Sequence, residues 1–258
     1  MSVLEIKKLT KSFGGLMANE NIDMTIEKNS ITAVIGPNGA GKTTFFNMIT
    51  GVYAPTSGDI LLNGESIVGL KPHVVAKKGI ARTFQNIRLF KNIPVLDNVM
   101  VGMHHHIKTH WYGVLLHLPK DRRNEEVAKK EAYRLLEYVG LADFLNEEAG
   151  NLSYGAQRRL EIARALATKP SILLLDEPAA GMNPKETKEL TTLIDNLRKE
   201  LDITVVLIEH DMKLVMGISD HIFVLDHGEN IAAGNPEEIR QHPKVIEAYL
   251  GKGAVSLA

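Results

Sequence analysis

The residues with the clearest chemical potential form one run between an apolar segment and a helix-like segment. They are Gly36, Pro37, Asn38, Gly39, Ala40, Gly41, Lys42 and Thr43. The order satisfies the pattern G-x-x-x-x-G-K-[S/T], in which glycines let backbone N–H groups turn inward around phosphate oxygens. Lys42 supplies a cation for the β- and γ-phosphates, and the Thr43 hydroxyl suits Mg²⁺. With Thr44, which follows directly, the run predicts a loop that binds ATP and Mg²⁺.

Two carboxylates follow a second apolar segment. Asp176 and Glu177 come directly after residues 172–175, and the carboxyl ends of strands are where open α/β sheets bind ligands. We expect Asp176 to hold Mg²⁺, directly or through water, and Glu177 to polarise the water that attacks the γ-phosphate. By itself such a pair also fits a solvated strand end with a helix cap, but beside a phosphate loop it favours hydrolysis.

His210 follows a third apolar segment, residues 204–208. It is therefore expected on the same edge of the sheet as the two carboxylates. A single histidine in such a place is more often a surface residue. Its catalytic interpretation depends on the family resemblance given below.

Several elements are needed to position these residues. Residues 31–35, 172–175 and 204–208 are compact apolar runs, typical of central parallel strands covered on both faces. Alternating apolar positions in residues 3–9 and 22–26 predict two short strands of a sheet with one wet face. Residues 60–62 predict another such strand, which ends in the turn residues Asn63 and Gly64.

Helical patterns lie between the predicted strands. They cover residues 42–50, 122–139 and 184–200, and the last begins at the capping residue Asn183 and at Pro184. Strands that alternate with helices predict an α/β doubly wound core.

We assign this core to residues 1–85 and 151–258, as parts of a single domain. Residues 86–150 offer helical patterns without a buried strand, so they are predicted to form an inserted helical subdomain. Residues 251–258 are predicted to be a loose tail.

Composition excludes some classes of protein. The chain has 258 residues, of which 30 are Lys or Arg and 31 are Asp or Glu, so its formal net charge is -1. No global positive field is available for nucleic acid, and the absence of cysteine excludes disulfides. No stretch reaches the roughly 20 apolar residues of a membrane span. We therefore expect a cytoplasmic chain that contacts a membrane only through a partner.

A further run precedes the segment that leads to Asp176. It reads Asn151, Leu152, Ser153, Tyr154, Gly155, Ala156, Gln157, Arg158 and Arg159, and a helical pattern is predicted over residues 157–167. The run resembles the signature motif of the ATP-binding cassette (ABC) ATPases. With the phosphate loop, Gln85, Asp176, Glu177 and His210 it completes that family's ordered motifs. The resemblance covers nearly the whole chain. It implies a P-loop NTPase fold with a RecA-like doubly wound core, an N-terminal antiparallel β subdomain and an inserted helical subdomain.

The resemblance assigns roles by position. Phe13 is similar to the aromatic residue that stacks on adenine, with an ordinary apolar loop residue as the alternative. Gln85 resembles the residue that contacts Mg²⁺ and the attacking water, and His210 resembles the switch histidine at the γ-phosphate. Ser153 and Gly155 would contact ATP held by a second ATPase subunit. A head-to-tail dimer is therefore implied, either with a copy of this chain or with a paralogue.

The chain departs from the family pattern at three positions. Tyr154 and Ala156 replace the third and fifth letters of the usual Leu-Ser-Gly-Gly-Gln. Ser153 and Gly155 are kept, so ATP hydrolysis is expected to survive. Asn183 stands where the family usually carries an aspartate that crosses the dimer interface, so coupling between the two sites is expected to be affected.

Finer matches are similar to the ATPase subunits of branched-chain amino-acid importers. They lie in residues 81–85, 174–184, 208–220 and 236–251, and the insertion at 103–119 resembles the larger of two ATPase paralogues. The resemblance implies a subunit on the inner face of the cell membrane. Permease subunits would contact the helical subdomain and the segment bounded by Gln85 and Pro94. Importers of urea or amides, exporters and soluble cassette ATPases remain alternatives.

Overall fold

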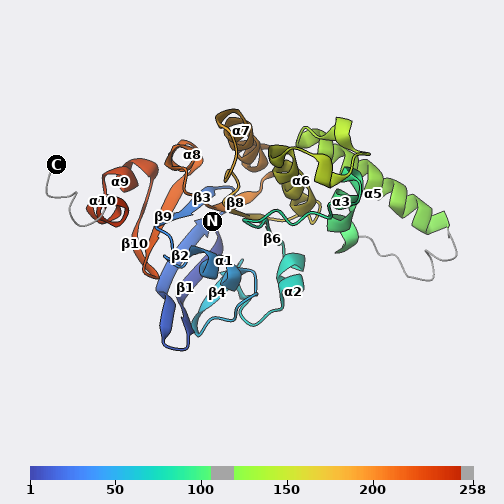
Figure 1. Ribbon diagram of the computed structural model, residues 1–258. Coiled ribbons are helices and arrows are strands. Elements are labelled where there is room, and N and C mark those ends of the chain that lie inside the picture. Colours follow the sequence, from blue (N-terminus) through green and yellow to red (C-terminus); the bar gives the residue numbers. More distant parts are fainter. Residues whose placement is uncertain (106–118, 251–258) are drawn as a thin grey trace.

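The computed structural model describes residues 1–105 and 119–250. Two sheets form one lobe of the molecule, and a group of helices extends to one side of it (Figure 1). Within the described part no helix has the length and apolar character needed to cross a membrane. Most of the predicted insertion at 103–119 and the predicted tail at 251–258 lie outside the described residues.

The larger sheet has the strand order β10-β9-β3-β8-β7-β6. Its central strands are β3 (Ile31–Ile35), β8 (Thr204–Ile208) and β7 (Ile172–Asp176), which are buried along their whole length and pair in parallel. The three predicted central strands are therefore confirmed, and β7 extends one residue further, to Asp176.

Three more strands complete this sheet. A short strand, β6 (Ile80–Arg82), pairs in parallel with β7 at one edge. At the other edge lie β9 (His221–Asp226) and β10 (Glu229–Gly234), which pair as an antiparallel hairpin. This hairpin was not predicted from the sequence.

The second sheet has the order β2-β1-β4-β5 and is antiparallel. Its strands are β1 (Ser2–Phe13), β2 (Leu16–Glu27), β4 (Ser57–Leu62) and β5 (Glu65–Ser66). The prediction of two short strands was wrong, because β1 and β2 each span 12 residues. In both strands the apolar alternation stops before the strand does. Backbone pairing continues through bulges into the polar ends of β1 and β2. The turn at Asn63 and Gly64 is confirmed, with both residues in the left-handed region.

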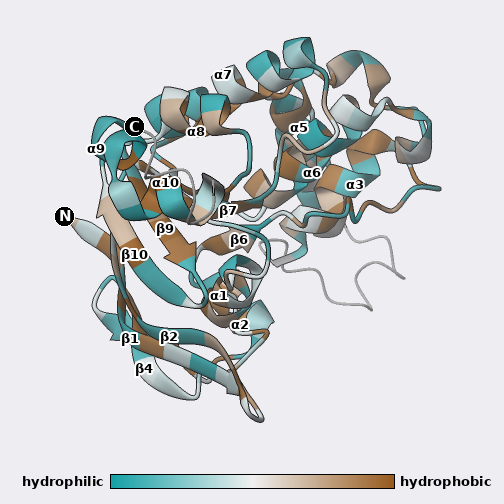
Figure 2. Ribbon diagram, turned by 60° about the vertical axis from the view of Figure 1, so that its left-hand side comes forward, coloured by the Kyte–Doolittle hydropathy of each residue, from teal (hydrophilic) through white to brown (hydrophobic). Residues whose placement is uncertain are grey.

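Helix α1 (Lys42–Ile49) lies between the two sheets, and its Phe45, Phe46 and Ile49 are fully buried there. Successive residues of the central strands alternate between this core and a second one on the opposite face. That opposite core includes residues of α6 (Tyr154–Leu166), α7 (Pro184–Leu201) and α8 (Met212–Ile218). The apolar strands therefore run between layers whose outer faces are more polar (Figure 2).

Between β6 and α6 the described residues form helices and one isolated bridge, Pro94 to Glu148. The longer helices are α3 (Val95–Gly102) and α5 (Pro119–Tyr138), which pack on each other and on α6. The short helices η1 (Met103–His105), η2 (Ala142–Phe144) and η3 (Ala149–Asn151) also lie in this segment. Elsewhere in the chain are α2 (Pro72–Lys77), before β6, and α9 (Pro236–Gln241) and α10 (Pro243–Leu250), after β10.

Helices α1 and α7 have nearly the predicted bounds, but α5 begins at Pro119 rather than at residue 122, and α6 also begins early. Helix α6 begins at Tyr154, three residues before the predicted start at Gln157. The reason is the cap, because the Ser153 hydroxyl accepts a hydrogen bond from the backbone N–H of Ala156. Ser153 and Gly155 therefore belong to the first turn of the helix.

Asn183 caps α7 as predicted. Its side-chain oxygen accepts hydrogen bonds from the N–H groups of Lys185 and Glu186, both at 3.0 Å. The Glu186 carboxylate in turn accepts from the Asn183 N–H at 3.0 Å, which completes a capping box.

We predict that Asn183→Ala lowers the free energy of unfolding by about 1 kcal/mol, because it removes this cap. Asn183→Asp should leave it within about 0.5 kcal/mol of wild type, since aspartate caps equally well. Urea denaturation measures both. Asn235→Ala, which breaks the matching capping box of α9, serves as the comparison. Equal free energies of unfolding for the wild type and Asn183→Ala would contradict the prediction.

Candidate functional site

The predicted phosphate loop joins β3 to α1 in a conformation that requires glycine. Gly36 and Gly41 have φ angles of 148° and 96°. A Cβ atom on Gly36 would lie 2.0 Å from the Leu225 carbonyl oxygen, and one on Gly41 would lie 2.4 Å from that of Ala18. Neither position has room for a side chain. The loop therefore keeps its path close to the backbones of β2 and β9.

Lys42 is buried at the start of α1. Its Nζ donates to the carbonyl oxygens of Gly36, at 2.7 Å, and Pro37, at 2.9 Å. Burial lowers the pKa of Lys42, while the charges of Glu177 and Asp176 act in the opposite direction. The ammonium group is thus folded back onto its own loop. The next residue, Thr43, is exposed, and Thr44 is half-buried.

Asp176 is buried at the end of β7 and forms an ion pair with Arg82 at the end of β6. Arg82 Nη2 donates to Asp176 Oδ2 at 2.7 Å, and Arg82 Nη1 donates to Asn47 Oδ1 at 2.6 Å. The guanidinium lies over the rings of Phe46 and Phe84, at 5.5 and 5.3 Å from their centroids. No role was predicted for Arg82. The sequence contains one indication of this ion pair. Arg82 is a charged residue inside a strand-like segment, and a buried charge needs a partner.

The residues predicted to hold Mg²⁺ offer oxygen ligands of the right kind. They are the Thr43 hydroxyl, the Asp176 carboxylate and the Gln85 amide oxygen, and Mg²⁺ prefers such ligands together with phosphate and water. Among the described residues no cluster of three His, Asp or Glu side chains could hold a metal by itself. The donor set therefore fits an ion that shares its ligands with a nucleotide.

Glu177 lies between two of the other predicted site residues. Its Oε2 accepts a hydrogen bond from Gln85 Nε2 at 2.8 Å, and its Oε1 lies 3.0 Å from His210 Nε2. Glu177 has a φ of 48°, and its N–H donates to the Ile208 carbonyl at 2.9 Å. Gln85 lies three residues after the end of β6 at Arg82. The structure thus brings Gln85, Glu177 and His210 together.

Ser153 and Gly155 lie at the beginning of α6, a helix that lies apart from α1 in both ribbon views (Figures 1 and 2). Ser153 is exposed, while Gly155 is buried against the Glu186 side chain. A Cβ on Gly155 would lie 2.7 Å from Glu186 Oε1. Within the described residues, Ser153 bonds to the first turn of α6 and Gly155 packs against Glu186 of α7.

Arg158 connects α6 to the segment that carries Gln85. Its guanidinium is fully buried, and it donates to the carbonyl oxygens of Phe84 at 2.5 Å and Gln85 at 2.7 Å. It also pairs with Glu161 at 3.1 Å and donates to the Tyr154 hydroxyl at 3.3 Å. From the sequence, Arg158 is recognisable only as part of the motif. Its backbone partners lie far along the chain, so no local pattern indicates them.

Phe13 is exposed at the end of β1. Its ring meets that of Tyr53 edge to face, with centroids 5.3 Å apart. Lys11 Nζ lies 4.9 Å from the Phe13 centroid and donates to the Ala54 carbonyl at 2.8 Å. Tyr53 and Lys11 therefore fix the orientation of Phe13, and its predicted role as the adenine platform remains a prediction.

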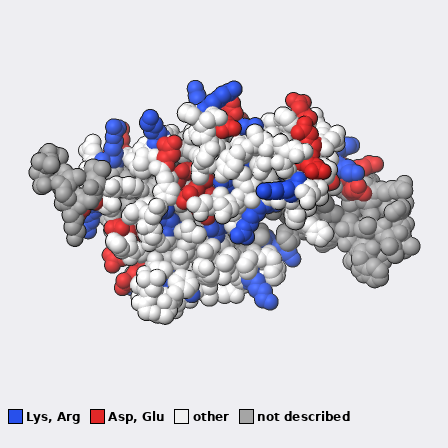
Figure 3. Space-filling view, in the orientation of Figure 1, with Lys and Arg blue, Asp and Glu red and all other residues white. Residues whose placement is uncertain are grey.

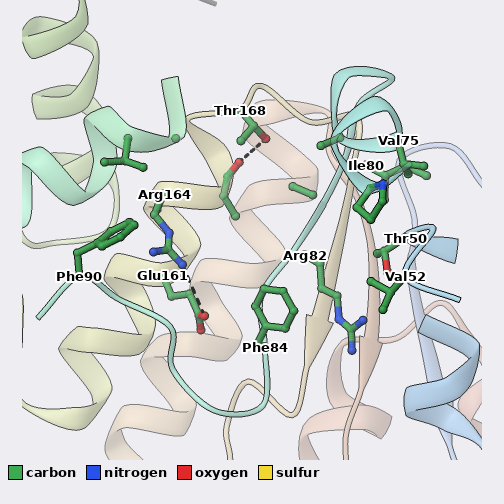
Figure 4. Close-up of a pocket in the computed structure, with 16 residues that line it drawn as sticks. Thr50, Val52, Val75, Ile80, Arg82, Phe84, Phe90, Glu161, Arg164 and Thr168 are labelled. Carbon is green, nitrogen blue, oxygen red and sulfur yellow. Dashed lines mark hydrogen bonds and ion pairs between the residues drawn. The ribbon is translucent and has the colours of Figure 1, made fainter. Parts of the chain in front are cut away.

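A cleft of about 390 Å³ separates the end of β6 from α3 and α6. Arg164 and Glu161 project from α6 between Phe90 and Phe84 (Figure 4). Phe90 is exposed, with 53% of its surface accessible. Burial lowers the pKa of Arg164, whereas Glu161 acts in the opposite direction. The cleft thus combines apolar walls with buried charge.

Elsewhere, basic and acidic side chains are interspersed over the face seen in Figure 3.

The buried Arg82–Asp176 pair gives a stability prediction. We predict that Arg82→Met lowers the free energy of unfolding by about 3–5 kcal/mol, because it leaves a buried carboxylate without its partner. The double variant with Asp176→Asn should lose less. Urea denaturation measures both. Arg198→Met, which breaks a more exposed pair with Asp220, should cost at most about 1 kcal/mol. Equal losses in the single and double variants would contradict this account of the pair.

Two family profiles match the sequence. The profile described as ABC transporter matches residues 19–180, and the profile described as branched-chain amino acid ATP-binding cassette transporter matches residues 229–255. The chain is also similar to the high-affinity branched-chain amino acid transport ATP-binding protein BraF of Pseudomonas aeruginosa. The two are 53% identical over 250 residues, which cover 97% of this chain and 98% of BraF.

Solved structures are similar over most of the chain. The ADP conformation of MJ1267, an ATP-binding cassette of an ABC transporter, has a TM-score of 0.85 and 31% identity, covering 98% of this chain and 100% of that one. The dimeric post-hydrolysis state of the ATP-binding cassette MJ0796, bound to ADP and Pi, has a TM-score of 0.76 and 26% identity. It covers 90% of this chain and 98% of that one.

Proposed function

Because this chain belongs to the ABC transporter family of ATP-binding cassettes, we propose that it is the ATP-hydrolysing subunit of an importer for branched-chain or related hydrophobic amino acids. The observation that carries the hydrolytic part is the Glu177 carboxylate, held between Gln85 and His210 beside the phosphate loop. The amino-acid part is supported by the likeness to BraF and by the match of residues 229–255.

In the proposed mechanism the loop of residues 36–44 binds the phosphates of ATP through its backbone N–H groups. Lys42 leaves the Gly36 and Pro37 carbonyls and takes phosphate oxygens as its partners. Thr43, Asp176 and Gln85 would hold Mg²⁺, which would neutralise charge on the β- and γ-phosphates. Phe13 stacks on the adenine.

Glu177 orients and polarises the attacking water. The water oxygen bonds to the γ-phosphorus as the bond to the ADP oxygen breaks, and the water proton leaves towards the Glu177 carboxylate. Gln85 and His210 keep that carboxylate in place before ATP arrives. His210 then contacts the γ-phosphate, so both neighbours of Glu177 respond to whether the nucleotide carries that group.

A second ATPase subunit completes each site in this proposal. Ser153 and Gly155 begin α6, whose positive end suits a γ-phosphate, yet they lie apart from α1 of their own chain (Figure 1). They would serve the ATP bound by a second subunit, either another copy or a paralogue. The dimeric structure of the similar cassette MJ0796 supports an assembly of two ATPase subunits.

The membrane permease would dock at the cleft in Figure 4. Its walls come from the β6 side and from α3 and α6, so a helix seated there would touch both the core and the helical unit of residues 86–150. Gln85 to Pro94 would form the rim. The chain would then act on the inner, cytoplasmic face of the cell membrane without entering it.

We predict that Glu177→Gln binds ATP with near wild-type affinity, lowers turnover at least about 100-fold and accumulates an ATP-bound dimer, because the carboxylate that polarises water is lost. Phosphate release and gel filtration with ATP measure these effects. Lys42→Ala is the comparison and should weaken ATP binding itself, so no dimer should form. Wild-type turnover in Glu177→Gln would remove this residue as the base.

We predict that Phe90→Asp abolishes ATP-dependent amino-acid uptake in vesicles that contain the permease, because it places a charge on the apolar rim of the cleft. ATP affinity, measured by calorimetry on the purified chain, should stay unchanged. Leu201→Asp alters an exposed apolar residue outside the cleft and should leave uptake intact. Full uptake by Phe90→Asp would place the permease elsewhere.

A further inference from the structure

A buried carboxylate, Glu209, lies next to His210 and has no role in the mechanism above. It follows β8 directly, and only 3% of its surface is accessible. Its Oε1 accepts a hydrogen bond from the Ala179 N–H at 2.7 Å, and its Oε2 accepts from the N–H groups of His210 at 3.0 Å and Asp211 at 3.4 Å. The two oxygens therefore have different partners.

These partners belong to two different loops. Ala179 lies in the loop of residues 177–183, which follows β7 and contains Glu177 and Asn183. His210 and Asp211 lie in the short loop after β8. The backbone ladder between the two strands ends where Asp176 pairs with Ile208, with a last bond from the Glu177 N–H. Beyond this point Glu209 replaces the ladder and holds the two loops together.

A neutral or solvent-exposed side chain at this position would cost less free energy than the buried carboxylate of Glu209. Burial raises the pKa of Glu209, and the nearby charge of Glu177 acts in the same direction, while the three backbone N–H groups oppose both. Asp211 does not share the task, because its side chain caps α8 by accepting from the N–H groups of Lys213 and Leu214. Two carboxylates therefore hold His210: Glu209 accepts from its backbone N–H, and Glu177 contacts its ring Nε2.

We propose that Glu209 is a positioning residue, which sets His210 against Glu177 and fixes the loop of residues 177–183 relative to it. The proposal rests on the proposed ATP hydrolysis. Because the two oxygens serve different loops, any movement of His210 towards a bound γ-phosphate pulls on the loop that carries Asn183. Glu209 thereby connects the group that senses the nucleotide to the segment expected at the contact with the second subunit.

The test is Glu209→Gln, which keeps the shape but turns one acceptor into a donor facing an N–H group. We expect kcat to fall about 10- to 100-fold, with the dissociation constant of ATP within about twofold of wild type. The matched control is Asp220→Asn. Asp220 accepts from the Ile31 N–H at 2.8 Å, at the opposite end of the parallel strands. This control should keep wild-type kcat at temperatures where it is folded.

A double-mutant cycle separates positioning from general stability. In a His210→Ala background, Glu209→Gln should lower kcat by a smaller factor than in the wild type, because only its effect on the loop of residues 177–183 remains. Hydrogen exchange gives an independent readout. Peptides that cover residues 177–183 should exchange faster in Glu209→Gln, although they lie about 30 residues away in sequence.

The outcomes are distinct. Wild-type kcat in Glu209→Gln, or equal losses with and without His210, would overturn this inference while leaving the proposed function intact. Absence of ATP hydrolysis by the wild-type chain would overturn the proposed function instead. If Glu209→Gln were too unstable for kinetics, unchanged exchange in residues 177–183 under native conditions would still contradict the inference.

Discussion

The hydrogen bonds from Gln85 and His210 to Glu177 depend on the order of three parallel strands. Since β7 lies between β6 and β8, the residue that follows β7 has one neighbour from each adjacent strand end. Glu177 is that residue, and its two carboxylate oxygens face Gln85 and His210 respectively. The phosphate loop follows β3, the next strand beyond β8. Sheet order alone thus places the loop, the histidine, the carboxylate and the glutamine along one edge.

The parts of this arrangement that follow from local physics were predictable. Buried parallel strands must be apolar on both faces, which is why β3, β7 and β8 are visible in the sequence. The run Ile222 to Leu225 of β9 carries a similar apolar signal. The two-residue turn to β10 is marked only by Gly228, which like His227 has a positive φ, and His-Gly is not among the commonest hairpin pairs. The lengths of β1 and β2 were missed because backbone pairing, unlike burial, leaves no pattern in side-chain polarity.

Side-chain partners of buried charges were not predictable, because they are chosen by the assembled fold. Arg82 and Asp176 are 94 residues apart, and Arg158 contacts the backbone of Gln85 across 73 residues. Burying each of these groups costs free energy, and each one joins two elements of the site. Tyr154, a departure from the usual signature, takes part in this network through its hydroxyl bond to Arg158. A glycine at that position has no such group to offer.

The departure at Asn183 has a different physical meaning. Its side chain is committed to α7 by two hydrogen bonds, and Glu186, which completes the cap, also packs against Gly155 of the signature run. Glu209 holds the other end of the same loop through Ala179. The loop of residues 177–183 is therefore fixed at both ends within its own chain. The Asn183 side-chain oxygen already accepts two bonds in the first turn of α7. Any influence of Asn183 on a second subunit must therefore act through the position of this loop, through its lack of charge or through the side-chain NH₂ group.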